Sequence, residues 1–112
     1  MEFPEFIMAL PQMDVPFDPK VVETRAIQSD RGLMMMVFAH QDFELPMHHH
    51  KAQWGTVLTG ELILTIGDET NTYLKGDSYS IPDGAVHGGV LKAGTVVIDM
   101  FEEPDRYQLK PD

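Results

Sequence analysis

The fold of this chain can be read outward from one stretch, GDSYSIPDGAVH at positions 76–87. It contains a Gly-Asp turn, a short run of strand-forming residues over 78–81, a Pro-Asp-Gly turn, and the start of a further run that carries His87. Glycine, proline and aspartate favour tight turns, whereas tyrosine and isoleucine favour strands. The stretch therefore predicts two short strands joined by a turn.

The same alternation of short runs and turn residues continues on both sides of this stretch. The predicted strands cover 21–28, 33–40, 54–59, 61–66, 70–74, 78–81, 85–91 and 95–101. Turn signals recur roughly every eight to twelve residues, and almost no stretch carries a helical period. The pattern predicts an all-β protein, either a sandwich or a barrel.

The composition is that of one acidic globular domain. The 112 residues include 18 acidic and 8 basic side chains, a formal net charge of −10, which argues against nucleic acid and anionic membranes as partners. Because there is no cysteine, disulfides, thiolate ligands and thiol nucleophiles are excluded. The first residues are acidic where a signal peptide is basic, and the longest apolar run, 33–39, is too short to span a bilayer. We expect a cytoplasmic protein.

The two ends of the chain differ from the middle. Residues 1–20 carry four prolines among many apolar side chains, so we expect an apolar arm that is packed but is not a central strand. Residues 21–112 are expected to form a single barrel domain, with a solvated turn over 102–107. The arm can lie across a neighbouring chain in a two-fold homodimer, which is our prediction, or fold back on its own barrel.

Three histidines and a glutamine form the candidate metal site. Side chains alternate between the two faces of a strand, so His48 and His50 point one way and His49 the other. Two such imidazoles can share one metal ion, because neutral imidazole suits Zn, Cu, Fe and Ni. His87 can meet them across a barrel, and Gln53 offers its amide oxygen as a fourth ligand. We interpret His49 as a solvated side chain.

These residues resemble a known family. Residues 76–87 match the second cupin motif, G-x5-P-x-G-x2-H, without departure. The H-x-H of the first cupin motif is present at 48–50, and Gln53 with Gly60 matches its closing E-x6-G, with glutamine in place of glutamate. The resemblance covers roughly residues 33–101. It implies a cupin-like double-stranded β-helix, a jelly-roll barrel, with a metal held inside by two histidines, an acid and a third histidine.

Two departures from the family pattern affect the site. The family has three or four residues between the H-x-H and the acid, whereas this chain has only positions 51–52. Strict alternation would then place His50 and Gln53 on opposite faces, and a bulge or tight bend at 51–52, which we favour, restores a common face. Without it, the residues that share a face with Gln53 are Met47, His49 and Lys51. Glutamine also leaves the charge of a divalent ion uncompensated by protein, which favours an anionic ligand.

The sequence leaves more than one class of function open. We expect a metal-binding protein that acts on or binds a small oxyanionic molecule, by dioxygenase, isomerase or lyase chemistry at an Fe, Zn, Mn or Ni ion. The alternative is a non-catalytic module that keeps its metal or ligand and binds or senses a small molecule. Separately, the metal can be structural or adventitious. A third interpretation is a partner-binding protein whose histidines are vestigial. No residue stands out as a catalytic base, and Tyr79 and His40 are the nominees.

Overall fold

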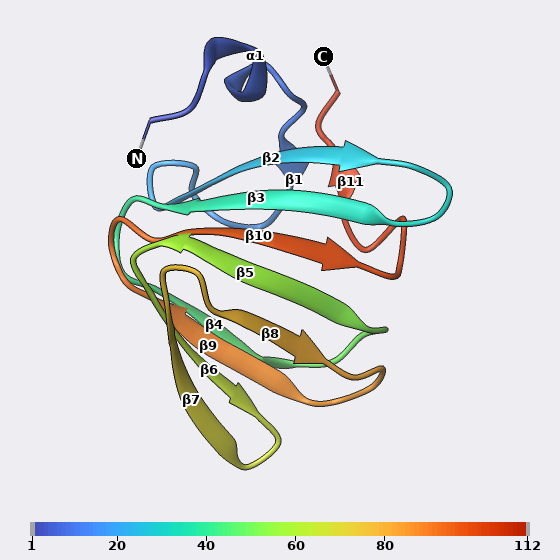
Figure 1. Cartoon of the computed structure of the whole chain (residues 1–112). Coiled ribbons are helices and arrows are strands. Elements are labelled where there is room, and N and C mark those ends of the chain that lie inside the picture. Colours follow the sequence, from blue (N-terminus) through green and yellow to red (C-terminus); the bar gives the residue numbers. More distant parts are fainter. Residues whose placement is uncertain (1, 112) are drawn as a thin grey trace.

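Two antiparallel sheets face each other in the computed structural model, which describes residues 2–111 (Figure 1). The first sheet has five strands in the order β2 (Val22–Gln28), β3 (Leu33–Ala39), β10 (Val96–Phe101), β5 (Gln53–Thr59) and β8 (Ser78–Ile81). The second has four strands in the order β4 (Phe43–His48), β9 (His87–Leu91), β6 (Glu61–Ile66) and β7 (Glu69–Leu74). A two-stranded sheet joins β1 (Met13–Asp14) to β11 (Gln108–Leu109). The predicted all-β fold, a jelly-roll barrel, is confirmed.

The strand β4 was absent from the predicted series, and its sequence explains why. Pro46 lies within it and Glu44 and Pro46 are exposed, so the stretch does not look like a regular strand. Proline lacks the amide hydrogen that a central strand donates, and it is tolerated on edge strands and at bulges. Both conditions hold here, because β4 is an edge of the four-stranded sheet and its pairing with β9 shifts register between Leu45 and His48.

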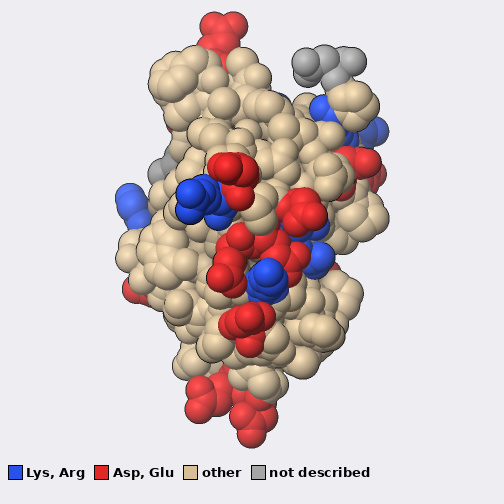
Figure 2. Space-filling model, turned by 90° about the vertical axis from the view of Figure 1, so that its right-hand side faces the viewer, with Lys and Arg blue, Asp and Glu red and all other residues tan. Residues whose placement is uncertain are grey.

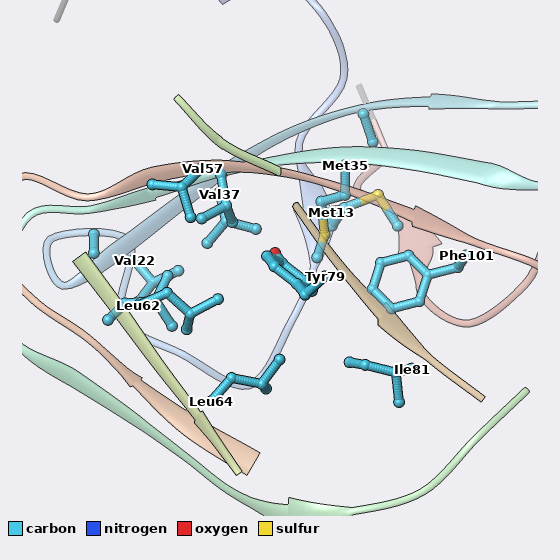
Figure 3. Close-up of a cluster of buried hydrophobic side chains, with 14 of the residues drawn as sticks. Met13, Val22, Met35, Val37, Val57, Leu62, Leu64, Tyr79, Ile81 and Phe101 are labelled. Carbon is cyan, nitrogen blue, oxygen red and sulfur yellow. The ribbon is translucent and has the colours of Figure 1, made fainter. Parts of the chain in front are cut away.

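The core lies between the two sheets and is built from alternate residues of their strands. Val57, Leu62 and Val97 are among its buried members, and Tyr79 lies in its middle (Figure 3). Side chains on the same face of a strand recur every second residue, so each strand contributes to this one interior. The β5–β6 hinge needs Gly60, which has a φ of +88° and whose added Cβ would lie 2.5 Å from the Thr95 Cα. The interior is therefore closed tightly at the end opposite the histidines.

The N-terminal arm folds back on its own barrel, which was the alternative placement. Within it, α1 (Glu5–Met8) is a short helix that the sequence did not suggest. Phe3 packs edge-to-face on Phe38 at 5.4 Å between ring centroids, and the Arg25 Nε donates to the Met8 carbonyl at 2.8 Å. Met36 and Phe38, on the outer face of β3, are buried beneath the arm. The homodimer stays a prediction, because the structure contains one chain. No helix in the described part of the chain has the length and apolarity needed to cross a bilayer.

Candidate metal centre

The structure brings His48, His50 and His87 together, where β4 ends and β9 begins. Figure 1 shows these two strands side by side. His48 is the last residue of β4 and pairs directly with His87, the first residue of β9. His50 follows two residues later. One ligand atom from each of the three imidazoles lies within 4.8 Å of the other two. Side chains from two distant parts of the sequence thus converge on one point.

Hydrogen bonds fix the orientation of all three rings. The Nδ1 atoms of His48, His50 and His87 lie 2.8, 2.7 and 2.9 Å from the backbone carbonyls of Pro46, Lys51 and Ala85. A carbonyl only accepts, so each Nδ1 carries the proton and each Nε2 keeps a lone pair. An outer carbonyl that fixes the tautomer in this way is the usual support of a metal-binding histidine.

Two of these lone pairs accept no hydrogen bond from residues 2–111. The Nε2 atoms of His50 and His87 are buried and have no hydrogen-bond partner among residues 2–111. Most buried polar atoms in proteins are paired, so unpaired ones call for an explanation such as an ion. A divalent metal at the meeting point would use all three lone pairs, and neutral imidazoles are suitable ligands for it. The residues present therefore fit a metal ion.

Burial and a nearby positive charge favour the neutral form of His50 and of His87. Burial lowers the pKa of both rings, and the positive charge of Arg106 lowers both further. A neutral imidazole is the form that binds metal, so these two rings are favoured in the form that a metal requires.

His49 points away from the cluster. It is exposed, whereas His48 and His50 are partly buried, as the sequence indicated. The strand ends at His48, and the chain bends at Lys51 before β5 begins at Gln53. Beyond this bend Gln53 lines the cavity of the barrel, whereas His50 belongs to the histidine cluster and does not line that cavity. Met47, His49 and Lys51, the alternative ligand face, are all exposed.

Contacts from distant residues hold the loop that carries His50. The Gly84 amide donates to the His50 carbonyl at 2.9 Å, and the Lys51 amide donates to the Glu103 carboxylate at 2.8 Å. The Ala52 amide donates to the Glu102 carboxylate at 3.3 Å, and the Glu102 amide donates to the Ala52 carbonyl at 2.9 Å. The 102–107 segment, expected as a solvated turn, is therefore a support of the site.

Gln53 lines the barrel interior beside the histidines. It is the first residue of β5, and it pairs with Ile81 on one side and Phe101 on the other. A side-chain hydrogen bond from Gln53 is one of the influences that lower the pKa of Asp99, against the larger effect of burial. The role of Gln53 as a fourth metal ligand stays a prediction.

Asp99, which forms a buried pair with the nominated Tyr79, is the part of the site that the sequence analysis missed. The Tyr79 hydroxyl donates to the Asp99 Oδ1 at 2.5 Å. Burial raises the pKa of Asp99 to about 6 although Tyr79 and Gln53 lower it, and burial beside Asp99 raises the pKa of Tyr79. A signal for Asp99 exists in the sequence, because strand alternation places it inward between Val97 and Phe101. His40, the other nominated base, contacts the Glu23 carboxylate through its Nε2 at 2.8 Å and does not belong to the cluster.

His48, His87 and Asp99 line one cavity of about 80 Å³. The polar side chains in its wall also include Gln53 and Tyr79, and the rest of the wall is mostly apolar. The apolar lining includes Val22, Met35, Val37, Leu62, Leu64, Leu91 and Val97. A concave, mostly apolar space with a few converging polar groups is the usual form of a small-molecule site.

Comparisons with known proteins agree with this architecture. An RmlC-like cupin from Shewanella frigidimarina is similar with a TM-score of 0.77 and 21% sequence identity, over 95% of this chain and 94% of that chain. KdgF from Halomonas sp. is similar with a TM-score of 0.72 and 23% identity, over 85% of this chain and 86% of that chain. Bacillus subtilis oxalate decarboxylase is similar with a TM-score of 0.66 and 20% identity, over 75% of this chain and 26% of that chain. At these identities the likeness concerns the fold. A comparison with curated proteins finds no match.

The family assignment comes from the sequence itself. Residues 34–101, more than half of the chain, match the family model described as a cupin domain. The matched region contains all three histidines and Gln53, and it ends at the last residue of β10. The chain belongs to the cupin family.

Proposed function

We propose that this cupin binds one divalent metal ion through His48, His50 and His87 and uses it to bind and polarise a small oxyanionic molecule in the barrel. The observation that carries the proposal is the convergence of three oriented imidazoles, two of which have buried, unpartnered Nε2 atoms. Fe, Zn, Mn and Ni all accept such ligands. Bacillus subtilis oxalate decarboxylase, a protein of similar fold, has Mn(II) centres, which supports a metal of this class.

The charge of the ligand set supports an anionic partner. Three neutral imidazoles, with Gln53 as a weaker fourth ligand, leave both charges of a divalent ion uncompensated by the residues that hold it. A bound cation is the largest local charge in such a site and attracts a hydroxide, carboxylate or enolate. When bound, the metal supplies Lewis acidity to the oxygen that it contacts.

The chain's own residues supply the rest of the chemistry. Asp99 is the carboxylate that lines the same cavity, and it is placed to take a proton from a molecule held there. Tyr79 donates to Asp99 and holds it in one orientation. The apolar walls exclude water from the reacting molecule, which strengthens the electrostatic interactions inside. This arrangement supports isomerase or lyase chemistry, with dioxygenase chemistry as a further option where the ion is iron.

The experiment measures turnover and binding separately. Protein purified without an affinity tag is loaded with Fe, Zn, Mn or Ni and mixed with a panel of small carboxylic and keto acids, with product formation followed by NMR. We expect conversion of at least one compound by the wild type, at least a hundredfold slower conversion by Asp99→Asn, and no change in His49→Ala. Metal-dependent binding without conversion would identify a binding or sensing module instead. Equal behaviour with and without metal would contradict the proposal.

A further inference from the structure

Arg106 lies at the mouth of the cavity, in the turn between β10 and β11. It lines a surface hollow of about 390 Å³ together with Tyr107, His48 and apolar side chains of the arm and of β4. Phe17, Leu45, His48 and Tyr107 also line the inner cavity, so the hollow is its vestibule. Arg106 is the only fully charged side chain among the described residues that line the vestibule. It also lies outside residues 34–101, the region that matches the cupin model.

The guanidinium of Arg106 is not paired with an acid of the protein. Its Nε is buried without a hydrogen-bond acceptor, and it forms no salt bridge with an acidic side chain of residues 2–111. This is unexpected in a chain with 18 acidic residues, and acidic side chains gather on the face of the molecule at this end of the barrel (Figure 2). A buried guanidinium nitrogen without an acceptor is a donor that a bound ligand can satisfy.

Contacts within the protein hold Arg106 in position before any ligand binds. Its guanidinium carbon lies 4.7 Å from the centre of the Tyr107 ring, a stacking contact that limits the rotation of the side chain. The Gln28 amide donates to the Pro104 carbonyl at 2.6 Å, and Leu109 pairs with Met13, so the backbone is held on both sides of the turn. Arg106 and His48 line the same vestibule, which places the guanidinium on the side of the barrel where the three histidines meet.

We propose that Arg106 binds the carboxylate of the molecule that enters the barrel, and that the substrate class is a small monocarboxylate with an apolar body. The planar guanidinium matches a carboxylate with two parallel hydrogen bonds. The inner cavity is apolar and contains Asp99, so the body of the molecule lies inside and its negative end stays in the vestibule. The inference rests on the proposed function, in which the same carboxylate faces the metal held by His48, His50 and His87, since His48 and Arg106 line the same vestibule.

Butanoate, butanamide and inorganic phosphate are suitable probes, because they separate a carboxylate from its neutral isostere and from another oxyanion. Each is titrated into full-length, tag-free protein, with and without zinc, by calorimetry and by NMR of the Arg106 Nε–H signal. We expect butanoate to shift that signal and to bind at least tenfold more tightly than butanamide or phosphate. Arg106→Met should lose at least tenfold in butanoate affinity, Arg106→Lys should lose less, and Lys75→Met, which removes an exposed charge away from the vestibule, should match the wild type.

The outcomes separate this inference from the proposed function. Zinc-dependent butanoate binding that is the same in Arg106→Met and in the wild type would overturn the role of Arg106 and leave the proposed function intact. Binding that needs Arg106 but is the same without zinc would support Arg106 and count against the metal's part in the proposed function. Tighter binding of phosphate than of butanoate, or no shift of the Arg106 signal by butanoate, would overturn the inference.

Discussion

The two segments that supply the three histidines are built in different ways. His87 begins a regular strand between β4 and β6, and its Nδ1 is held by Ala85, two residues upstream. His50 lies outside any strand, after a register shift in β4, and its loop is held by residues such as Glu103 from the other end of the chain. One segment is thus positioned by local sequence and sheet pairing, and the other by long-range contacts. The tail as well as the barrel therefore helps to position the three histidines.

The largest expected effect on metal affinity comes from removing His87, the predicted ligand on the regular strand β9. His87→Ala takes away the most buried imidazole of the three, and we expect metal affinity to fall more than a hundredfold. Loss of an outer supporting group typically costs roughly 10–100-fold in metal affinity, and loss of a ligand should exceed that. The measurement is competition for zinc against a chelator of known affinity. His49→Ala is the matched control and should bind zinc like the wild type; a His49→Ala variant that loses the metal would contradict the assignment.

A second test probes the buried pair that faces the ligands across the cavity. The ordinary pKa of 3.8 for Asp99 is raised to about 6 in the folded chain, a difference that corresponds to about 3 kcal/mol at most. A raised folded-state pKa means that protonated Asp99 stabilises the fold below about pH 4, and that this contribution is lost as the pH rises through 6. Asp99→Asn cannot lose a proton.

We therefore expect Asp99→Asn to gain stability relative to the wild type as the pH rises from 4 to 7. Urea unfolding of both metal-stripped proteins at several pH values measures the difference, because the other titrating groups are common to both. Parallel stability curves over this range would show that Asp99 has an ordinary pKa in the folded state.

The third prediction concerns how closely Gly55 of β5 packs against the buried Tyr79–Asp99 pair. A Cβ added to Gly55 would overlap the Tyr79 ring and hydroxyl and the Asp99 carboxylate. Overpacking of a well-filled core typically costs about 1–3 kcal/mol. We expect Gly55→Ala to lower the free energy of unfolding by about 2 kcal/mol, measured by urea denaturation.

Gly76→Ala is the control for this substitution. Its added Cβ meets nothing within 4 Å, so the only cost is that of alanine at the positive φ of +89°. It should cost about 1 kcal/mol, at the lower end of the penalty for a residue with a Cβ in the left-handed region. A Gly55→Ala variant no less stable than Gly76→Ala would mean that Tyr79 and Asp99 can move apart.

The smallest effect on stability and zinc affinity is expected from a change that loosens the loop carrying His50. Glu103→Ala removes the acceptor of the Lys51 amide and loosens the loop that carries His50. We expect a loss of about 1 kcal/mol in stability, typical of one hydrogen bond, and a threefold to tenfold weaker zinc affinity. Glu103→Gln keeps an acceptor oxygen and should restore the affinity. Equal affinity in Glu103→Ala and the wild type would show that the loop holds its shape without the tail.

The sequence was sufficient wherever a feature depended on neighbours along the chain. Turn residues separated the strands, and the motif over 76–87 placed His87 because a strand follows a Pro-Asp-Gly turn directly. Strand alternation separated His49 from the other two histidines of its run, as the structure has them. The same alternation along β10 carries enough signal to place Asp99 inside the barrel.

The features that could not be predicted depend on contacts between distant residues. Lys51 and Glu103 are 52 positions apart, and no local pattern indicates that they meet. The same holds for Arg106, whose role follows from the vestibule that the arm and β4 form around it. The arm itself was recognised as apolar, but its short helix and its position on the outer face of β3 come from packing against Met36 and Phe38.

The most direct test of this account is a crystal structure of the zinc-loaded, tag-free protein with anomalous diffraction data. The account predicts one strong anomalous peak per chain, at about 2.0–2.1 Å from the Nε2 atoms of His48, His50 and His87, which is the usual zinc–imidazole distance. A peak bound by His49 or His40 in place of this cluster would contradict it. So would a zinc-soaked crystal in which no peak lies within bonding distance of all three histidines.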